Sequence, residues 1–247
     1  MSEEKKIIET KNMILNDGKT VIKNSDGTQS TVEYRYTDDV TYKVPSSTVH
    51  AVLPRSATEI KECAFFEYVN LISVEIPESV TKIGGRAFFR CEKLERILLP
   101  ESVTEIGGGA FSSCKSLEEA IIQGNVTEIK EDTFYGCQKL SSLALPESIT
   151  VIEKNAFSLC KSLRRLMLPE SLTKIEKFAF SGCENLESIA LPCGIKEIGQ
   201  RAFDECPKLK TIFYAGSKAD WAKIKIHKDN PKLTGIFGKA KIYCDHK

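Results

Sequence analysis

The sequence predicts a repeat solenoid: a right-handed β/α superhelix of short parallel strands, loops and short helical turns, capped at both ends. Phenylalanine recurs every 23 residues from Phe65 to Phe203, and isoleucine and leucine keep the same interval through about seven units. One such unit cannot enclose its own apolar side chains, so successive units have to stack on one another and share a continuous core.

Composition excludes several classes of protein. Of the 247 residues, 41% are hydrophobic and 28% charged, and 35 basic residues oppose 34 acidic ones. A net charge this small creates no strong field toward nucleic acid or an anionic membrane, so we predict no nucleic-acid partner. No stretch reaches the roughly 18 apolar residues of a membrane span, and the polar start is unlike a signal peptide, so we predict no membrane insertion.

Each unit is expected to begin with a strand. In residues 163–168 apolar side chains alternate with others, which is the period of a strand with one buried face. A proline follows this strand in most units, where it removes a backbone donor and fixes φ for the turn. After the turn, Val103 and Ile106 are predicted to point inward from an extended or loosely coiled stretch. Phe111 and Cys114 then have the spacing of about one helical turn.

Two repeated residue types are predicted to form columns through the core. They are Phe88, Phe111, Phe134, Phe157, Phe180 and Phe203 in one column, and Cys91, Cys114, Cys137, Cys160, Cys183 and Cys206 in the other. Cysteine is often buried, and its weak S–H donor can bond to a backbone carbonyl of the next coil. We therefore interpret these thiols as structural.

The consensus unit LxxIxLPESVTxIgxxAFxxC resembles the BspA-like, bacterial surface-antigen type of leucine-rich repeat. The resemblance covers about residues 53–214. It implies a curved leucine-rich repeat solenoid that binds proteins, frequently as an adhesin on host-associated microbes, and it implies no enzymatic activity. Two units depart from the consensus, with Gln-Gly-Asn at residues 123–125 and Cys-Gly at residues 193–194. These are turn residues, so we expect altered turns and an intact stack.

The two ends are interpreted as caps. Residues 1–47 form an N-terminal β-hairpin or cap, because Asn-Asp-Gly at residues 16–18 lies between apolar runs and residues 32–44 alternate as strands do. Residues 48–214 form the solenoid, and residues 215–247 a helix–strand cap. Ser217 and Asp220 resemble a capping box at the start of a helix, and residues 240–243 form a final strand. Trp221 is expected to close the last coil, and its segment resembles the family's helical end cap.

Catalytic and metal sites are not predicted. Neighbouring column cysteines direct their Cβ atoms in parallel, which disfavours disulfides, and a linear file of thiols lacks the convergence of a zinc site. His50, His227 and His246 fall in different segments without an adjacent nucleophile. We expect no cofactor and no enzyme activity. The roles of Cys63, Cys193 and Cys244 stay open. So does the compartment, because reduced thiols suit a cytosol or an anaerobic habitat, whereas the resembled family is often secreted or on the cell surface.

The side chains that face outward from the strands form a candidate binding face. The fifth position of each unit gives the apolar row: Glu75, Leu98, Ile121, Ala144, Met167, Ala190 and Phe213. The third position gives the flanking row: Ser73, Arg96, Glu119, Ser142, Arg165, Ser188 and Thr211. An exposed apolar row beside Arg and Glu is typical of a protein contact surface. Strand propensity with partial cover by neighbouring side chains is the alternative explanation.

We therefore predict a non-enzymatic protein-interaction module that acts in adhesion or ligand binding, as a monomer or weak homodimer. The predicted contact residues are Arg96, Leu98, Glu119, Ile121, Arg165, Met167 and Phe213. Its partner is expected to be a protein, with host and cell-surface proteins as candidates. The alternatives are a self-associating structural protein, a thiol-based metal or redox protein, and a carbohydrate-binding surface that uses Trp221 and scattered tyrosines.

Overall fold

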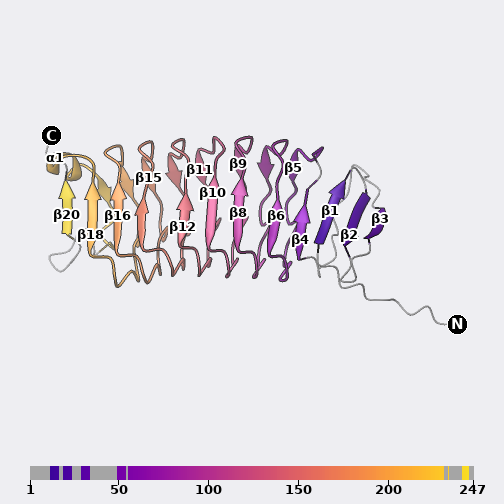
Figure 1. The fold of residues 1–247 in the computed structure, drawn as a ribbon. Helices are drawn as coiled ribbons and strands as arrows, with labels where there is room; N and C mark the ends of the chain where they lie inside the picture. The colour runs from indigo at the N-terminus through magenta and orange to yellow at the C-terminus, as the bar shows by residue number, and fades with distance from the viewer. Residues whose placement is uncertain are drawn as a thin grey trace.

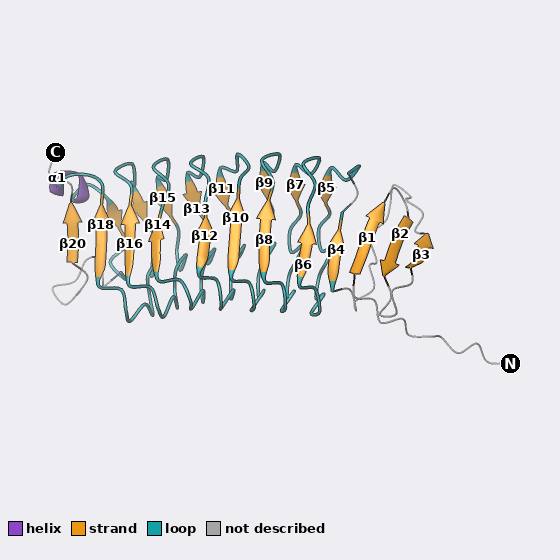
Figure 2. Cartoon of the chain, in the orientation of Figure 1, coloured by secondary structure: helices purple, strands orange, loops and turns teal. Residues whose placement is uncertain are grey.

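The structure, a computed structural model, describes residues 12–16, 19–23, 29–33, 49–53, 55–230, 233 and 241–244. The chain winds into a parallel β-solenoid of about seven turns with little helix. One strand of each turn lies in a front row, and a shorter strand lies behind it (Figures 1 and 2). The predicted repeat solenoid is confirmed.

Each turn contributes one front strand and one back strand. The front strands are β4 (His50–Val52), β6 (Ser73–Glu75), β8 (Arg96–Leu99), β10 (Glu119–Ile122), β12 (Ser142–Ala144), β14 (Arg165–Met167), β16 (Ser188–Leu191), β18 (Thr211–Tyr214) and β20 (Lys241–Cys244). The back strands are β5 (Glu59–Ile60), β7 (Lys82–Ile83), β9 (Glu105–Ile106), β11 (Glu128–Ile129), β13 (Val151–Ile152), β15 (Lys174–Ile175), β17 (Glu197–Ile198) and β19 (Lys225–Ile226).

Hydrogen bonding divides the front row into three parallel groups. These are β4 with β6, then β8, β10 and β12, then β14, β16, β18 and β20. Within a group, equivalent repeat positions face one another, as Leu98 faces Ile121. The back strands correspond to the stretch that the sequence predicted to be extended or loosely coiled. They pair because Ile106 and its equivalents point into the core and leave the backbone free to bond between turns.

The phenylalanines stack through the centre of the solenoid. From Phe65 to Phe203, successive ring centroids lie 5.0–5.4 Å apart, and the planes of successive rings differ by no more than 12°. All seven rings are buried, together with the repeated leucines and isoleucines. This spacing is close to the separation of adjacent strands, so each ring contacts the rings of the two neighbouring turns.

The segment around each phenylalanine forms hydrogen-bonded turns in place of the short helical turns that the sequence predicted. Its N–H groups alternate between two partners. Cys91 donates within its own turn to the Phe88 carbonyl at 3.1 Å, whereas Phe88 donates to Ala110 of the next turn at 2.7 Å. The alternation requires left-handed residues, with φ of 53° at Arg86 and 57° at Arg90. A continuous α-helix would direct every N–H along its own axis and leave adjacent turns unbonded.

The column cysteines also bond between turns, but in the opposite direction from the predicted one. Each of the six thiols donates to a phenylalanine carbonyl of the preceding turn, as Cys137 does to Phe111, at sulfur–oxygen distances of 3.1–3.3 Å. The carbonyl of the next turn was expected to accept. The preceding turn accepts instead because its phenylalanine carbonyl lies beside the sulfur, which satisfies a buried weak donor.

The polar residues of the repeat bond to the preceding turn as well. The Ser102 hydroxyl donates to the Val80 carbonyl at 2.6 Å. The Thr173 hydroxyl donates to the Thr150 carbonyl at 3.1 Å. These bonds hold the backbone where it leaves the front strand, and they explain why the turn repeatedly contains Ser and Thr.

Two turns differ in sequence from the consensus unit, and only one of them has altered hydrogen bonding. In a regular turn, Val103 donates to the Pro100 carbonyl at 3.1 Å. Val126 donates instead to Gly124, at 2.9 Å, whereas Ile195 keeps the regular bond to Pro192, at 3.3 Å. The strands beside both turns remain paired. The expected alteration therefore occurs at residues 123–125 and does not occur at residues 193–194.

We expect Gly124→Ala to lower the free energy of unfolding by about 1–3 kcal/mol, because the tighter turn leaves no room for a side chain. A Cβ atom at Gly124 would lie 1.8 Å from the carbonyl oxygen of Val103, a backbone atom that cannot rotate away. Equilibrium urea unfolding measures the loss. Gly85→Ala is the matched control, since the nearest atom to its Cβ would be 3.5 Å away. Equal stability of the two variants would contradict this account.

Additional strands extend the front row at both ends. At the N-terminal end, β1 (Asn12–Asn16) pairs antiparallel with β2 (Lys19–Lys23), as the predicted hairpin requires, and parallel with β4. A third strand, β3 (Gln29–Glu33), pairs antiparallel with β2. The predicted strand alternation through residues 34–44 lies outside the described residues.

At the C-terminal end the chain makes one irregular turn. Ser217 caps the short helix α1 (Lys218–Trp221), since its hydroxyl accepts from the Asp220 N–H at 3.2 Å. The helix ends at Trp221, and the chain then forms β19 and later β20. Trp221 is half-buried against the core, and its ring meets the Tyr214 ring edge-on at a centroid distance of 5.3 Å.

Candidate binding face

The apolar row and the flanking row lie on the outer surface of the front strands, which we call the front face. The residues between the two rows, such as Ile97 and Leu166, point into the core. Because no strand pairing joins β12 to β14, the predicted contact residues fall into two groups. Arg96, Leu98, Glu119 and Ile121 lie together on β8 and β10, and Arg165, Met167 and Phe213 lie on β14 and β18.

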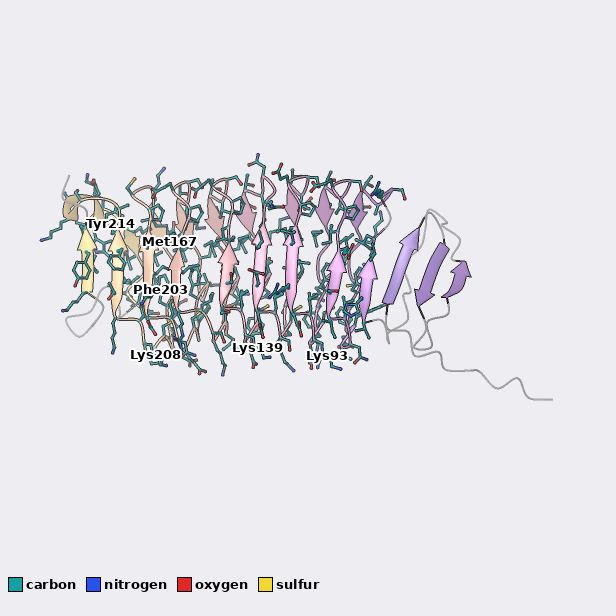
Figure 3. All side chains as sticks on the ribbon, viewed as in Figure 1. Lys93, Lys139, Met167, Phe203, Lys208 and Tyr214 are labelled. Atoms are coloured by element: carbon teal, nitrogen blue, oxygen red, sulfur yellow. The ribbon has the colours of Figure 1, made fainter. Side chains whose placement is uncertain are left out.

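Several members of the apolar row are strongly exposed. Met167 exposes 83% of its surface, Leu98 52% and Phe213 49%. Ile121 and Ala190 are half-buried between their neighbours. The side chain of Met167 projects from the front of the solenoid (Figure 3). Burial of so much apolar surface would be favourable, and the fold itself does not provide it.

The structure adds Tyr243 to the apolar row. β20 pairs with β18 so that Tyr243 lies opposite Phe213, and their rings stack at a centroid distance of 5.6 Å. Tyr243 is 52% exposed. The sequence predicts a strand here but not its register, because Tyr243 follows Phe213 by 30 residues and not by 23. The alternation of Lys241 and Tyr243 with Ile242 is the signal that could have placed it.

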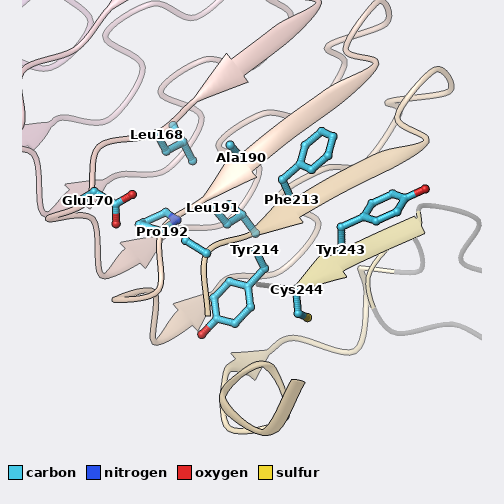
Figure 4. A pocket seen from close by; sticks show the side chains of 10 residues that line it. Leu168, Glu170, Ala190, Leu191, Pro192, Phe213, Tyr214, Tyr243 and Cys244 are labelled. Carbon is cyan, nitrogen blue, oxygen red and sulfur yellow. The ribbon is translucent and has the colours of Figure 1, made fainter. Parts of the chain in front are cut away.

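A hollow of about 230 Å³ adjoins this aromatic pair, where β14, β16, β18 and β20 end. In Figure 4, Leu168 and Glu170 lie at one end of the lining and the aromatic pair at the other, with Ala190, Leu191 and Pro192 between them. The lining residues are Leu168, Glu170, Ala190, Leu191, Pro192, Phe213, Tyr214, Ala215, Tyr243 and Cys244. The hollow is open and its lining is about as polar as it is apolar, so it suits a side chain presented by another molecule.

Charged side chains border the front face. Arg96 lies 3.8 Å from the Glu119 carboxylate, and Lys139 lies 3.7 Å from that of Glu118. Lys93, Lys139 and Lys208 line the edge at which the front strands begin (Figure 3). Arg165, also exposed, forms no ion pair with any described residue. The predicted flanking arginines therefore differ, since only Arg96 already has an acidic neighbour.

Burial disfavours thiolate formation in most of the cysteine column. Burial raises the pKa of Cys91 to about 12 and raises the pKa of Cys114, Cys137 and Cys160 well above the ordinary thiol value. The thiolate is the nucleophile and the metal ligand, and these thiols stay protonated. No group of three or more candidate ligands in the described part of the chain could hold a metal ion. Cys63 and Cys193 are exposed, and Cys244 is half-buried beside the hollow.

Comparison with known families explains the repeat. Six copies of the BspA type leucine rich repeat region match residues 40–161 and 114–223, which together cover most of the chain. The chain belongs to the BspA-type leucine-rich repeat family. The resemblance seen in the consensus unit is thereby confirmed. Comparison with curated proteins found no match.

Solved structures of bacterial leucine-rich repeat proteins are similar. One from Bacteroides ovatus has a TM-score of 0.59 and 25% identity over 82% of this chain and 59% of its own. One from Eubacterium ventriosum has a TM-score of 0.62 and 26% identity over 66% and 44%. The pneumococcal vaccine antigen PcpA, at 18% identity and a TM-score of 0.53 over 80% and 62%, shares the fold. The BspA-type chain thus spans less than two thirds of each of these proteins.

Family membership indicates a protein-interaction module, and proteins built from such repeats are typically non-enzymatic. Among the described residues, no helix of this BspA-type chain is long and apolar enough to cross a membrane.

Proposed function

We propose that the protein binds another protein through its front face, in adhesion or ligand binding. The proposed contact residues are Arg96, Leu98, Glu119, Ile121, Arg165, Met167 and Phe213, with Tyr243 added by its position beside Phe213. The observation that carries the proposal is the exposed apolar row, and Met167 at 83% exposure is its clearest member.

The energetics of the front face support contact with a protein. An antiparallel or parallel sheet face that meets only water usually carries polar side chains. Here Leu98, Met167 and Phe213 expose about half or more of their surface, and full burial of such a side chain is worth about 1.5–3 kcal/mol. The charged side chains beside them resemble the polar rim of an interface.

The test is a double substitution in the apolar row. Met167→Lys combined with Ile121→Lys should reduce partner binding by about thirtyfold or more, because two ammonium groups would have to be desolvated in the interface. The melting temperature should stay nearly unchanged, since Met167 is 83% exposed and a lysine stem can follow the surface at Ile121. Quantitative mass spectrometry of proteins captured from host and bacterial extracts provides the binding measurement.

The control places the same charge elsewhere. Val69 is 43% exposed and lies in a turn four residues before β6, outside the apolar and flanking rows, so Val69→Lys should retain every partner that the unmodified protein captures. If the double variant captures the same partners at the same level as the Val69 variant, the front face is not the binding surface.

A further inference from the structure

The residues directly at the starts of the front strands are mainly acidic in the N-terminal half and mainly basic in the C-terminal half. In the N-terminal half, the exposed or half-buried residues at the starts of β8, β10 and β12 are Glu95, Arg96, Glu118, Glu119, Ser141 and Ser142. In the C-terminal half, those at the starts of β14, β16, β18 and β20 are Arg164, Arg165, Glu187, Ser188, Lys210, Thr211 and Lys241. The first half therefore has three carboxylates and one cation, and the second has four cations and one carboxylate.

Among the described residues, the cations of the C-terminal half have no acidic partner. Arg164, Arg165, Lys210 and Lys241 are exposed and form no ion pair with a described residue. In the N-terminal half, by contrast, Arg96 already has Glu119 at 3.8 Å. The C-terminal half thus presents a positive border that a negatively charged partner can approach without displacing an internal ion pair.

The same half contains the most exposed apolar surface. Arg165 precedes Met167 by two residues, and Lys241 precedes Tyr243 by two, so the cations and the apolar side chains share one face. The hollow beside Phe213 and Tyr243 lies at the ends of the same strands, whereas Arg165 and Lys241 lie at their starts. Going along the strands, the surface changes from cationic to apolar.

We propose that the C-terminal half of the front face binds an extended acidic segment of a partner protein, in which carboxylates alternate with apolar side chains. The segment crosses β14, β16, β18 and β20. Its carboxylates face Arg165 and Lys241, and its apolar side chains face Met167, Phe213 and the hollow. Glu170, on the rim of the hollow, disfavours carboxylates on that side. This inference rests on the proposed function and specifies the chemistry of the partner.

The dimensions fit a segment of this kind. Arg165 and Lys241 are three strand spacings apart, which is about 14 Å. An extended chain covers that distance in about four residues, and residues separated by an even number project to the same side. Carboxylates four residues apart would therefore reach both cations, while the intervening side chains face the apolar row.

Two other occupants fit less well. A sulfated glycan would satisfy the cations but supplies no apolar side chain for Phe213, Tyr243 and the hollow. A second copy of this chain could offer its N-terminal half, but two of the three carboxylates there already lie beside Arg96 and Lys139. An acidic protein segment satisfies both the charge and the apolar surface.

The experiment uses the full chain and a fluorescein-labelled synthetic peptide in which Asp and Glu alternate with Phe and Leu. Fluorescence anisotropy should show binding that weakens as salt is raised, because the contacts are exposed ion pairs. Arg165→Glu combined with Lys241→Glu should weaken binding at least about tenfold, and Phe213→Ser should weaken it independently. Lys177→Glu, a charge reversal at an exposed cation in the turn after back strand β15, is the matched control and should change affinity less than about twofold.

Several results would overturn the inference. They are peptide binding that survives the Arg165 and Lys241 reversals, an equal loss with Lys177→Glu, and equal affinity for a peptide whose Phe and Leu are replaced by Ser. Heparin binding with the same dependence on Phe213, or self-association through Arg165 in sedimentation experiments, would assign the surface to the other occupants. Melting temperatures of all variants should match the unmodified protein, because the substituted side chains are exposed.

The two sets of variants distinguish failure of the acidic-segment inference from failure of the proposed function. If capture of extract proteins requires Met167 and Ile121 but not Arg165 and Lys241, the front face binds protein and the acidic-segment inference fails. If the Met167 and Ile121 double variant keeps all its partners, the proposed function itself fails.

Discussion

Raising the pH from about 7 to about 10 should lower the free energy of unfolding by about 7 kcal/mol, enough to unfold a domain of ordinary stability. The cause is the cysteine column. Burial raises the pKa of Cys91, Cys114, Cys137 and Cys160, and a hydrogen bond with Cys206 followed by burial raises that of Cys183. Each of these five thiols is expected to contribute about 1.4 kcal/mol at one pH unit above its unfolded-state pKa.

The sign follows from proton binding. An unfolded thiol titrates near 9.0, whereas the folded Cys91 titrates near 12, so above pH 9 the unfolded state holds fewer protons than the folded state. Stability is therefore complete below about pH 9 and is lost as the pH rises toward the folded-state pKa. Urea unfolding followed by circular dichroism, in the presence of a reductant and at several pH values, measures the loss.

Single cysteine variants isolate the contribution of the column from that of other titrating groups. Cys160→Ala should make the pH dependence shallower by about 1.4 kcal/mol per pH unit above pH 9, whatever its stability at neutral pH. Cys63→Ala, at an exposed cysteine outside the column, is the matched control. A Cys160 variant with the same slope as the Cys63 variant would exclude the column as the cause.

Truncation in the middle of the phenylalanine stack should be the most damaging single substitution at neutral pH. Phe134→Ala should lower the free energy of unfolding by about 3–5 kcal/mol, because it leaves a cavity that the rigid turns on either side cannot fill. The ring of Phe134 is fully buried, and its centroid lies 5.4 Å from that of Phe111 and 5.3 Å from that of Phe157. Equilibrium urea unfolding measures the change.

The same substitution on the front face provides the comparison. Phe213 is 49% exposed and contacts Tyr243 on only one side, so Phe213→Ala should cost less than about 1 kcal/mol. Similar losses for Phe134→Ala and Phe213→Ala would mean that the stack does not carry the stability assigned to it.

Much of the fold could be predicted because the same pattern of apolar and polar residues recurs in every unit. The interval of 23 residues is enough to place Phe134 between Phe111 and Phe157, and alternation is enough to place Ile97 inside and Leu98 outside. Where the interval changes, prediction fails. Tyr243 was missed because its register is set by backbone pairing with β18 across a longer connection.

Residue spacing also did not predict the backbone conformation of the turns around the phenylalanines. Phe111 and Cys114 have helical spacing, yet the left-handed residues Gly109 and Ser113 redirect alternate N–H groups to the next turn. Spacing along the chain does not reveal which N–H bonds to a neighbouring turn. The direction of the Cys137 thiol toward Phe111 was missed for the same reason.

The period, the buried columns and the outward rows all follow from the amino-acid sequence, because each depends on side-chain polarity at fixed intervals. The tertiary structure alone decided how the columns bond between turns, the stacking of Phe213 on Tyr243, the hollow beside them, and which of Arg96 and Arg165 has an acidic neighbour. These features depend on distances between residues far apart in the chain. Such distances are fixed only when the turns stack.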